Sequence, residues 1–410
     1  MEIYRDAKMI MDAALCSAMP DTAVEKALQQ LPEVTGKLVL IAAGKAAWQM
    51  AAAAYNTLGA KISGGVVCTK YDHCKGPIGN LILSEGGHPV PDANSYKGTQ
   101  LAIDAVDDLG ENDLVLFLIS GGGSALFEKP LVPEEEMADI TRQLLACGAD
   151  IVEMNTLRKR LSAVKGGKFA KLCAPAKVFS IILSDVLGDP LDMIASGPAY
   201  PDSSTREQAL AIIEKYQLRL SDAAMALMEQ ETPKTLANVE SHITGSVKQL
   251  CAAAAETAKS LGYKPVVLTA SLSCEARDAG SFLASMAQYH RASGEKLAFI
   301  AGGETVVHLT GKGKGGRNQE LALSGARGIA GLENTLLFSL GSDGTDGPTD
   351  AAGGIVDGTT AEKLRKKGIS IDAVLQNNDA YHALQAVDGL IVTGPTGTNV
   401  NDVAVALIKA

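Results

Sequence analysis

The chain is 410 residues long, more than one ordinary hydrophobic core contains, so two domains are expected. A hydrophobic content of 46% with 20% charged residues excludes an intrinsically disordered chain. The formal net charge of -10 argues against a general nucleic-acid or membrane-surface binder, because phosphate groups favour basic faces. The 7 cysteines lack zinc or redox spacing, and no apolar run reaches the ~18 residues of a membrane span, so we expect free thiols and a cytoplasmic protein.

The chain begins with two helices and a strand-helix unit. Amphipathic patterns predict helices over residues 4–18 and 21–30, and a buried strand over 37–43 precedes an alanine-rich helix over 46–58. Lys45 stands in the turn between this strand and helix, where no helix face requires a lysine. A cation in such a turn is well placed to meet an anion. A surface lysine beside a glycine hinge is the structural alternative.

Two further short strands, over 64–69 and 81–84, lead to a loop rich in glycine and proline that contains His88. A helix is expected from this loop to about residue 109. His88 is a candidate general base or substrate ligand. The alternative, which the local sequence favours, is that the histidine only holds the proline-rich loop in place.

The strongest local signal is the apolar run over 114–119, which predicts a strand buried on both faces. The residues that follow it are Ser120, Gly121, Gly122, Gly123 and Ser124. Three glycines allow a sharp turn with exposed backbone amides, and such a turn before a helix can bind phosphate. The alternative is a connection that needs glycine for steric reasons only. Similar polar turns after several other predicted strands favour phosphate binding.

A helix over 133–147 and a helical pair over 150–173 follow. The pair contains a cluster of basic residues between positions 158 and 168 in a chain that is acidic overall. This clustering, with a glycine pair inside it, favours an anion-facing turn over a merely solvated face. Asn155 and Arg160 are therefore candidate substrate-binding residues.

Aspartates follow the buried strand that is expected over 177–183. Asp185 and Asp189 lie in the turn beyond it, with Asp192 close behind. Carboxylates at the end of a strand suit a hard cation such as Mg2+, or a base that accepts a hydroxyl proton. Aspartate is also a common turn and N-cap residue, so each one alone is a weak signal.

A helical pattern over 205–260 has a polar break near 231–234, which predicts the domain boundary. The two expected domains are residues 1–235 and 236–410. The second domain has strands expected over 265–270, 297–301, 336–340 and 390–393, a helix over 274–291, and a less clear antiparallel strand over 305–309.

Glycines 311, 313 and 316 formally match a dinucleotide-binding motif before a helix. Lysines lie between these glycines, Arg317 follows them, and no convincing acidic ribose partner lies about 20 residues further on. The loop therefore favours terminal phosphates over a dinucleotide. Gly315 and Gly316 are candidate phosphate-binding residues, and Arg317 is a candidate cation.

Asp343 and Asp346 follow the strand over 336–340 and are spaced by glycine. This pattern suits a magnesium ion held partly through water and substrate phosphates. The alternation of strands and helices predicts an α/β fold, in which ligands bind beyond the carboxyl ends of strands. Cations, glycine amides and carboxylates at these ends are the groups that phosphoryl transfer requires. No P-loop or protein-kinase signature occurs.

The motifs together resemble the class II glycerate 2-kinases, a family with a C-terminal MOFRL domain. They are GKAA at 44–47, GGHPVP at 86–91, ISGGGSA at 119–125, LSDVLGD at 183–189, GGRNQE at 315–320 and SDGTDG at 342–347. The resemblance covers essentially the whole chain. It implies two α/β domains with mainly parallel sheets, a Rossmann-like N-terminal domain and a smaller C-terminal MOFRL domain, with the active site in the cleft between them.

The resemblance implies phosphorylation of D-glycerate at its 2-hydroxyl to give 2-phosphoglycerate, with ATP and Mg2+ as cofactors. It also implies that Lys45 and Arg317 are the catalytic cations. In the expected mechanism they neutralise charge on the γ-phosphate and the 120–124 loop holds phosphates. Asp343 and Asp346 bind the magnesium ion. Asp185 or Asp189 orients the glycerate hydroxyl and accepts its proton.

Two alternatives remain open from the sequence. One is an NAD(P)H-dependent hydroxypyruvate reductase, and the other is a non-catalytic nucleotide or sugar-acid binding protein. For partners we expect a small-molecule substrate, no nucleic acid and no membrane, with a homodimer as a possible assembly.

Overall fold

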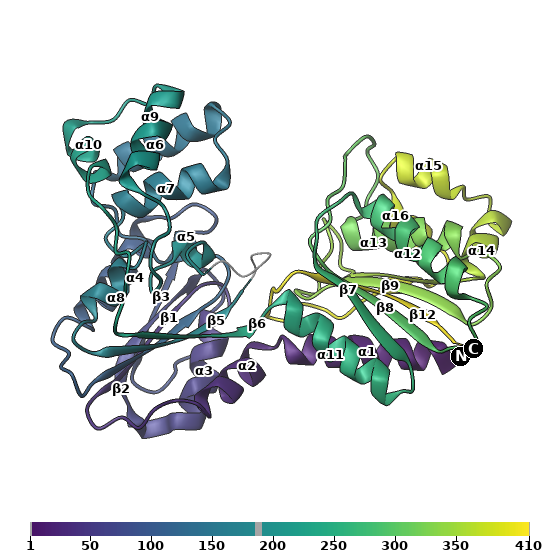
Figure 1. The fold of residues 1–410 in the computed structure, drawn as a ribbon, viewed down its shortest axis with the longest axis horizontal. Coiled ribbons are helices and arrows are strands. Elements are labelled where there is room, and N and C mark those ends of the chain that lie inside the picture. Colours follow the sequence, from purple (N-terminus) through teal and green to yellow (C-terminus); the bar gives the residue numbers. More distant parts are fainter. Residues whose placement is uncertain (1, 185–190, 410) are drawn as a thin grey trace. The chain divides into compact units, whose positions relative to one another are not determined.

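The structure is a computed structural model that describes residues 2–184 and 191–409. The chain forms two compact units (Figure 1). The first unit is Ala23–Thr244, and the second unit combines the residues up to Thr22 with those from Gly245 onward. This division between residues 244 and 245 differs from the domain boundary that the sequence predicts between 235 and 236. The N-terminal helix, predicted in the first domain, belongs to the second unit.

The first unit is built on a sheet with the strand order β3-β2-β1-β4-β5-β6. Its strands are β1 (Leu38–Ala43), β2 (Ile62–Lys70), β3 (Leu81–Gly86), β4 (Leu114–Ile119), β5 (Lys177–Leu183) and β6 (Val239–Gly245). β1 pairs in parallel with β2 and β4, as do β2 with β3 and β4 with β5. This is the Rossmann order, so the expected Rossmann-like domain is confirmed. The prediction of an entirely helical stretch over 205–260 was wrong, because β6 lies within it.

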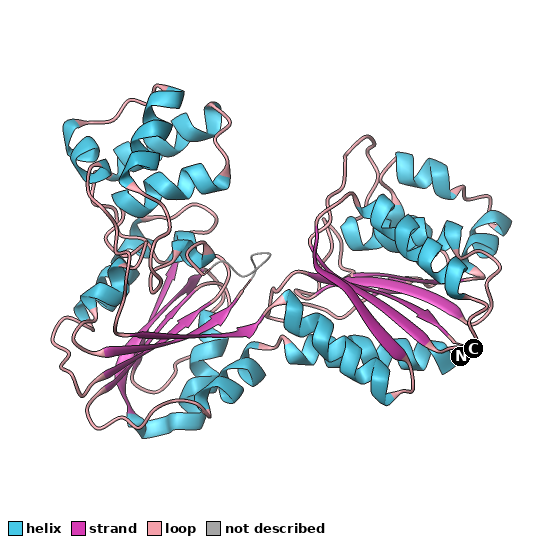
Figure 2. Cartoon of the chain, in the orientation of Figure 1, coloured by secondary structure: helices cyan, strands magenta, loops and turns pink. Residues whose placement is uncertain are grey.

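The order of this sheet reverses between β1 and β4, the point at which such sheets bind ligands. Side chains of β1 alternate between two cores, with Leu40 in one and Ile41 in the other. The first core is covered by α2 (Pro20–Leu28) and α3 (Ala47–Leu58), and the second by α4 (Ala93–Asp104) and α8 (Lys168–Leu172) (Figure 2). Because both faces are covered, β1 and β4 are apolar along their whole length.

A separate small core in the first unit is formed mainly by four helices. They are α6 (Glu134–Ala146), α7 (Ile151–Leu161), α9 (Arg206–Tyr216) and α10 (Asp222–Met228). Asp150, Thr205 and Ser221 cap three of them by accepting hydrogen bonds from first-turn amides. The shorter turns of the unit are η1 (Gly59–Lys61), α5 (Gly123–Leu126) and η2 (Ile194–Ser196).

The second unit contains a mixed sheet with the order β11-β10-β9-β12-β8-β7. Its strands are β7 (Lys264–Leu272), β8 (Leu297–Gly303), β9 (Thr335–Gly341), β10 (Gly353–Asp357), β11 (Leu390–Ile391) and β12 (Asp402–Ile408). β7, β8, β9 and β11 run in one direction, but only β7 and β8 are parallel neighbours, because β10 and β12 pair antiparallel with the strands beside them. The sequence analysis did not predict β10 or β12, which is why it missed these antiparallel pairings. The strand expected over 305–309 was wrong, because Val306 makes only an isolated bridge.

Helices cover both faces of the second sheet (Figure 1). One face carries α12 (Ala276–His290), α13 (Arg317–Gly328), α14 (Thr360–Lys366), α15 (Ile371–Gln376) and α16 (Ala380–Gln385). The other carries α1 (Glu2–Ser17) and α11 (Val247–Ser260). Tyr263 Oη donates a 2.9 Å hydrogen bond to buried Asp6, and Tyr4 Oη donates a 3.0 Å bond to Asp357. These bonds explain why α1 belongs to this unit.

Across the described chain, we find no helix with both the length and the apolar character needed to span a bilayer.

Candidate active site

The turns that follow β1 and β4 lie side by side, because these two strands pair in parallel. The Lys45 amide donates a 2.8 Å hydrogen bond to the Gly121 carbonyl. In the other direction, Ser120 Oγ accepts a 3.0 Å hydrogen bond from the Ala46 amide. The hydroxyl of Ser120 therefore joins the two turns, which is a structural role at the phosphate loop.

The side chains of Lys45 and His88 meet at Gly122. A Cβ atom built on Gly122 would lie 3.0 Å from Lys45 Cγ and 3.0 Å from the His88 ring, and φ of Gly122 is +84°. Both the left-handed backbone and the close approach therefore require glycine. The sequence placed these three residues in separate turns, and the fold brings them together.

This corner of the first unit is positively charged. Burial lowers the pKa of His88, and the charges of Lys45, Lys70 and His73 lower it further. As far as the structure is described, neither Lys45 nor Lys70 has a carboxylate partner. A group of cations without a neutralising carboxylate attracts an anion, so the prediction for Lys45 gains a physical basis.

The glycine loop adds backbone donors to this corner. The Gly123 amide bonds to the Ser120 carbonyl, but the amides of Gly121 and Gly122 donate to no acceptor among the described residues. Successive amides that point outward from a turn with a left-handed residue form an anion-binding concavity. The loop is therefore suited to the phosphate binding that its sequence predicts.

Asn155 is connected to the glycine loop through two serines. Ser124 Oγ lies 3.0 Å from Ser196 Oγ, which donates a 3.2 Å hydrogen bond to Asn155 Oδ1. Ser196 and the preceding Ala195 have φ of +61° and +52°. Left-handed backbone costs on the order of 1 kcal/mol per non-glycine residue, and such strain is concentrated at functional sites. Asn155 thus lies in the second layer behind the loop.

Arg160 lies inside the first unit, and its role as a substrate ligand stays a prediction. Its side chain is buried, and Nη1 donates to the Thr156 carbonyl at 2.8 Å and to Ser204 Oγ at 3.0 Å. Lys159 is likewise buried, 2.9 Å from Asp202. The basic stretch is therefore mainly an internal network of ion pairs and hydrogen bonds, which the clustering of charge in the sequence could not distinguish from an anion site.

Asp185 and Asp189 lie outside the described residues, so their roles as base or metal ligand stay predictions. Asp192, further along the same segment, is described. It lies 3.4 Å from Lys159 Nζ and accepts a 2.5 Å hydrogen bond from Ser203 Oγ. Asp192 therefore anchors this segment to the buried ion pairs of the first unit.

In the second unit, Arg317 is held by two carboxylates at the start of α13. Nε lies 2.5 Å from Asp402 Oδ2, Nη2 lies 3.0 Å from Asp402 Oδ1, and Nη1 lies 2.7 Å from Glu304 Oε1. Burial lowers the pKa of Arg317, but its hydrogen bonds and charge pairing with Asp402 outweigh this effect and raise the pKa above its ordinary value. The guanidinium group is thus permanently charged, fixed in orientation and still 33% exposed.

The side chain of Asp346 caps α13, and its role as a metal ligand stays a prediction. Its side chain is buried, with Oδ1 accepting from the Asn318 amide at 3.1 Å and Oδ2 from the Gln319 amide at 2.8 Å. Burial raises the pKa of Asp346 to about 7. Both oxygens satisfy the amides at the start of α13, where a carboxylate is favoured by the helix dipole.

Asp343 lies in the turn that follows β9. Its Oδ1 accepts a 2.9 Å hydrogen bond from the Thr345 amide, which closes the local turn. Among residues 2–184 and 191–409, no group of three or more His, Cys, Asp or Glu side chains could hold a metal ion. Binding of a magnesium ion by Asp343 and Asp346 together with water and substrate phosphates stays a prediction.

The loop at 311–316 is attached to the segment 377–379. The Gly311 amide donates to Asn378 Oδ1 at 2.9 Å, and the Gly313 amide donates to the Asn377 carbonyl at 2.8 Å. The preceding strand, β8, ends at Gly303, and irregular chain over 304–310 separates it from this loop, so the loop does not directly follow a strand as a dinucleotide-binding motif does. Phosphate binding by Gly315 and Gly316 stays a prediction.

Three residues of these sites were missed by the sequence analysis: Glu304, Asp402 and Ser196. Glu304 follows Gly302 and Gly303 at the end of a predicted strand, which was a usable signal. Asp402 begins β12, and this strand was not predicted. The left-handed backbone of Ser196 has no signal in the sequence.

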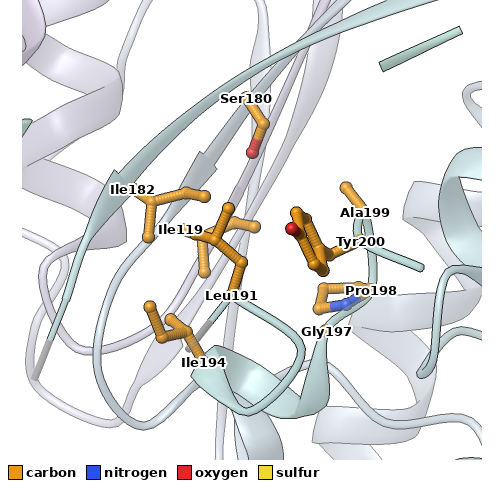
Figure 3. Close-up of a pocket in the computed structure, with 9 residues that line it drawn as sticks. All are labelled: Ile119, Ser180, Ile182, Leu191, Ile194, Gly197, Pro198, Ala199 and Tyr200. Atoms are coloured by element: carbon orange, nitrogen blue, oxygen red, sulfur yellow. The ribbon is translucent and has the colours of Figure 1, made fainter. Parts of the chain in front are cut away.

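A small cavity in the first unit lies among side chains that are almost all apolar (Figure 3). It is lined by Ile119, Ser180, Ile182, Leu191, Ile194, Gly197, Pro198, Ala199 and Tyr200. Ser180 Oγ is buried there, and within the described structure it has no hydrogen-bond partner. The lining contains no charged side chain, so this cavity does not resemble a phosphate or carboxylate site.

The Rossmann-like sheet with an anion-binding corner, and the second sheet with a carboxylate-held arginine, define a two-unit α/β protein suited to anionic ligands. Residues 6–229 match the family described as "Domain of unknown function (DUF4147)", and residues 297–402 match the "MOFRL family". The chain belongs to the MOFRL family of glycerate kinases, as its sequence motifs predicted.

Named relatives agree with this assignment. The chain is 53% identical over 405 residues to D-glycerate 2-kinase of Thermotoga maritima, covering 97% of each chain. It is 44% identical over 395 residues to glycerate 2-kinase of Pyrococcus horikoshii, covering 92% of this chain and 89% of the relative. A relative from Agrobacterium vitis, 40% identical over 98% of this chain and 93% of its own, has the provisional name hydroxypyruvate reductase.

A solved structure supports the fold at high similarity. The crystal structure of glycerate kinase from Thermotoga maritima has a TM-score of 0.95 to this chain, with 52% identity and 99% coverage of both chains.

Proposed function

We propose that this protein is a D-glycerate 2-kinase, which transfers a phosphoryl group from ATP to the 2-hydroxyl of D-glycerate and releases ADP and 2-phosphoglycerate. The observation that carries the proposal is the corner of the first unit. There the ammonium group of Lys45 and the backbone amides of Gly121 and Gly122 have no acceptor among the described residues. The names of the relatives supply the substrate. The physical chemistry of the corner supplies the reason that a phosphate binds.

In this proposal the glycine loop holds phosphate oxygens by its amides, and Lys45 neutralises the charge that develops on the transferred group. Preorganised donors of this kind provide most of the catalysis in phosphoryl transfer, because the protein needs to supply position and charge rather than covalent chemistry. His88, whose pKa is lowered by burial and by neighbouring positive charge, is proposed to form a hydrogen bond with the substrate.

Arg317 is proposed as the second catalytic cation. Two of its nitrogens are occupied by Asp402, which fixes the plane of the guanidinium group. Part of its side chain is exposed, so it can reach an anionic oxygen without losing this pairing. Asp185 or Asp189 is still proposed to accept the proton of the glycerate hydroxyl.

We propose ATP as the phosphoryl donor, with magnesium arriving as the nucleotide complex. Mg2+ commonly keeps several water ligands and binds through substrate phosphates rather than through an all-protein cage. This role is compatible with the absence of a three-ligand site among the described residues.

The proposal is tested by a coupled assay of ADP release from ATP, with D-glycerate and other small hydroxy acids, with and without Mg2+. NMR of the product then identifies the phosphorylated carbon. We expect magnesium-dependent ADP release with D-glycerate and phosphorus coupled to the proton on carbon 2. Phosphorus on carbon 3, or no glycerate-dependent ADP release, would contradict the proposal.

The reductase alternative is weakened by the local structure at 311–316. The glycine motif that supported it does not directly follow a strand, because β8 ends at Gly303, and the amides of Gly311 and Gly313 donate to residues 378 and 377. Oxidation of NADH with hydroxypyruvate, measured on the same preparation, separates the two activities. A non-catalytic binding protein would bind nucleotide without turnover in either assay.

A further inference from the structure

Lys165 contacts the glycine loop from the protein interior, and no step of the proposed reaction uses it. Its side chain is 0% exposed. The ammonium group donates a 2.6 Å hydrogen bond to the Ser124 carbonyl and a 3.3 Å hydrogen bond to the Phe127 carbonyl. Ser124 lies within the short turn α5 and Phe127 directly follows it, so Lys165 holds the end of the loop whose amides face the anion-binding corner.

The backbone next to Lys165 holds a second segment against the same loop. The Gly166 amide donates to the Ser196 carbonyl at 3.0 Å, and the Gly167 amide donates to the Gly197 carbonyl at 2.7 Å. A Cβ built on Gly123 would lie 2.7 Å from Ala195 Cβ, so the left-handed turn 195–197 packs directly on the loop. Residues 165–167 therefore connect both sides of the loop to one rigid element.

Glu128 neutralises Lys165 and has no other described role. Its Oε2 lies 3.3 Å from Lys165 Nζ, and both side chains are 0% exposed. In the described structure, neither oxygen of Glu128 accepts a hydrogen bond of good geometry. Burial lowers the pKa of Lys165 to about 8, despite the opposite charge of Glu128. An ion pair in such a place stabilises a fold no better than an apolar pair of similar size. Because burying these two charges costs desolvation free energy, we look for a role besides stability, and the contact with the 120–124 loop indicates that Lys165 positions this loop.

We propose that Lys165 is a positioning residue, which holds the Ser124 carbonyl so that the Gly121 and Gly122 amides are aimed at the phosphates of the nucleotide. This inference rests on the proposed function. It assigns no contact between Lys165 and any substrate. Removing the hydrogen bond from Lys165 to the Ser124 carbonyl should weaken nucleotide binding, even when the charge of Glu128 is removed at the same time.

The test separates the effect of the hydrogen bond between Lys165 and the Ser124 carbonyl from the effect of the ion pair between Lys165 and Glu128. Glu128→Gln removes the ion pair and keeps the hydrogen bond to Ser124. The double variant Lys165→Met/Glu128→Gln removes both, and it leaves no unpaired buried charge. Lys168→Met is the matched control, because Lys168 is a mostly buried lysine nearby that donates to the carbonyls of Arg160 and Ser162 instead.

Thermal melting, KM for ATP and for D-glycerate, kcat, and ATP affinity by calorimetry are measured on the full chain. We expect Glu128→Gln and Lys168→Met to keep the KM for ATP within about twofold, with lower melting temperatures. The double variant should lose on the order of tenfold to a hundredfold in ATP affinity and kcat/KM for ATP, because small displacements of positioning groups have effects of that size. A smaller change in KM for D-glycerate is expected.

Normal ATP affinity in the folded double variant would overturn the inference, as would an equal loss in Glu128→Gln. If the double variant does not fold, Lys165→Gln/Glu128→Gln replaces it, since the shorter amide does not reach the Ser124 carbonyl. Calorimetry keeps the two proposals distinguishable. A wild type that binds ATP but shows no glycerate-dependent turnover contradicts the proposed function, and the affinities still decide the role of Lys165.

Discussion

Arg317 and Asp402 form a two-point ion pair in which Nε and Nη2 of the arginine lie 2.5 and 3.0 Å from the two carboxylate oxygens. This geometry fixes both the position and the plane of the guanidinium group, because paired hydrogen bonds restrict its rotation. Glu304 adds a third contact, from a side chain that is 46% exposed. The two carboxylates therefore differ in how much they contribute to the orientation of Arg317.

The first prediction concerns this pair. Asp402→Asn should lower kcat on the order of tenfold to a hundredfold, because Arg317 loses its charged two-point partner and its preferred orientation. The matched variant Glu304→Gln should change kcat by less than about threefold, since partly exposed ion pairs are weak. Steady-state kinetics with melting temperatures checks both variants. Equal losses in the two would show that Asp402 does not orient Arg317.

Lys45→Met should reduce kcat/KM for ATP by about 100-fold or more, which is the effect of removing one preorganised donor from a transition state. Its melting temperature should stay near that of the wild type, because no ion pair of Lys45 appears among the described residues. Lys61→Met, which removes an exposed lysine at the end of η1, is the control and should be fully active. A Lys45→Met enzyme with wild-type turnover would refute the assignment of Lys45.

A third prediction uses Gly122 and a glycine with similar backbone but open surroundings. Gly122→Ala and Gly148→Ala both place a Cβ at positive φ, +84° and +74°. Each should lose on the order of 1 kcal/mol of unfolding free energy, as left-handed alanine requires. Only at Gly122 does the new atom meet Lys45 and His88, whereas nothing lies within 4 Å at Gly148. Chemical denaturation and kinetics together should therefore show matched stability losses and an activity loss in Gly122→Ala alone.

The pKa of His88 provides a prediction that requires no turnover. Burial lowers this pKa below 6.5, and the charge of Lys45 lowers it further. Lys45→Met should therefore raise the pKa of His88, and a bound phosphate anion should also raise it. NMR titration of the histidine ring resonances measures both changes. An unchanged His88 pKa in Lys45→Met would mean that the two side chains are not electrostatically coupled.

The same lowered pKa has a consequence for stability. Between the folded pKa of His88 and the unfolded value near 6.5, the unfolded chain binds more protons than the folded chain. The contribution of His88 to the unfolding free energy should therefore rise with pH across this window and become constant above it. The slope should be smaller in His88→Asn, as measured by denaturation at several pH values below 7.

The sequence alone determined the Rossmann-like first unit and the turns at its switch point. Apolar runs such as 114–119 are readable because a strand buried on both faces has no polar alternation, and the glycines after it mark the turn. The resemblance of the motifs to the class II glycerate 2-kinases then predicted the kinase activity. That Lys45, His88 and the glycine loop meet at one corner is seen only in the folded sheet.

Other features were decided only by tertiary structure. The sequence did not show that the side chains of Lys159 and Arg160 are buried, or that Lys45 has no ion-pair partner among the described residues. A pattern of charges along the chain does not say which carboxylates will lie next to a given cation in the fold. The sequence also did not show that the oxygens of Asp346, a predicted metal ligand, accept hydrogen bonds from two amides at the start of α13. β12, which carries Asp402, lies between β8 and β9, and both of these strands are far from β12 in the sequence. Long-range pairing of this kind depends on packing and not on local residue preference, so the partner of Arg317 could be found only in the folded protein.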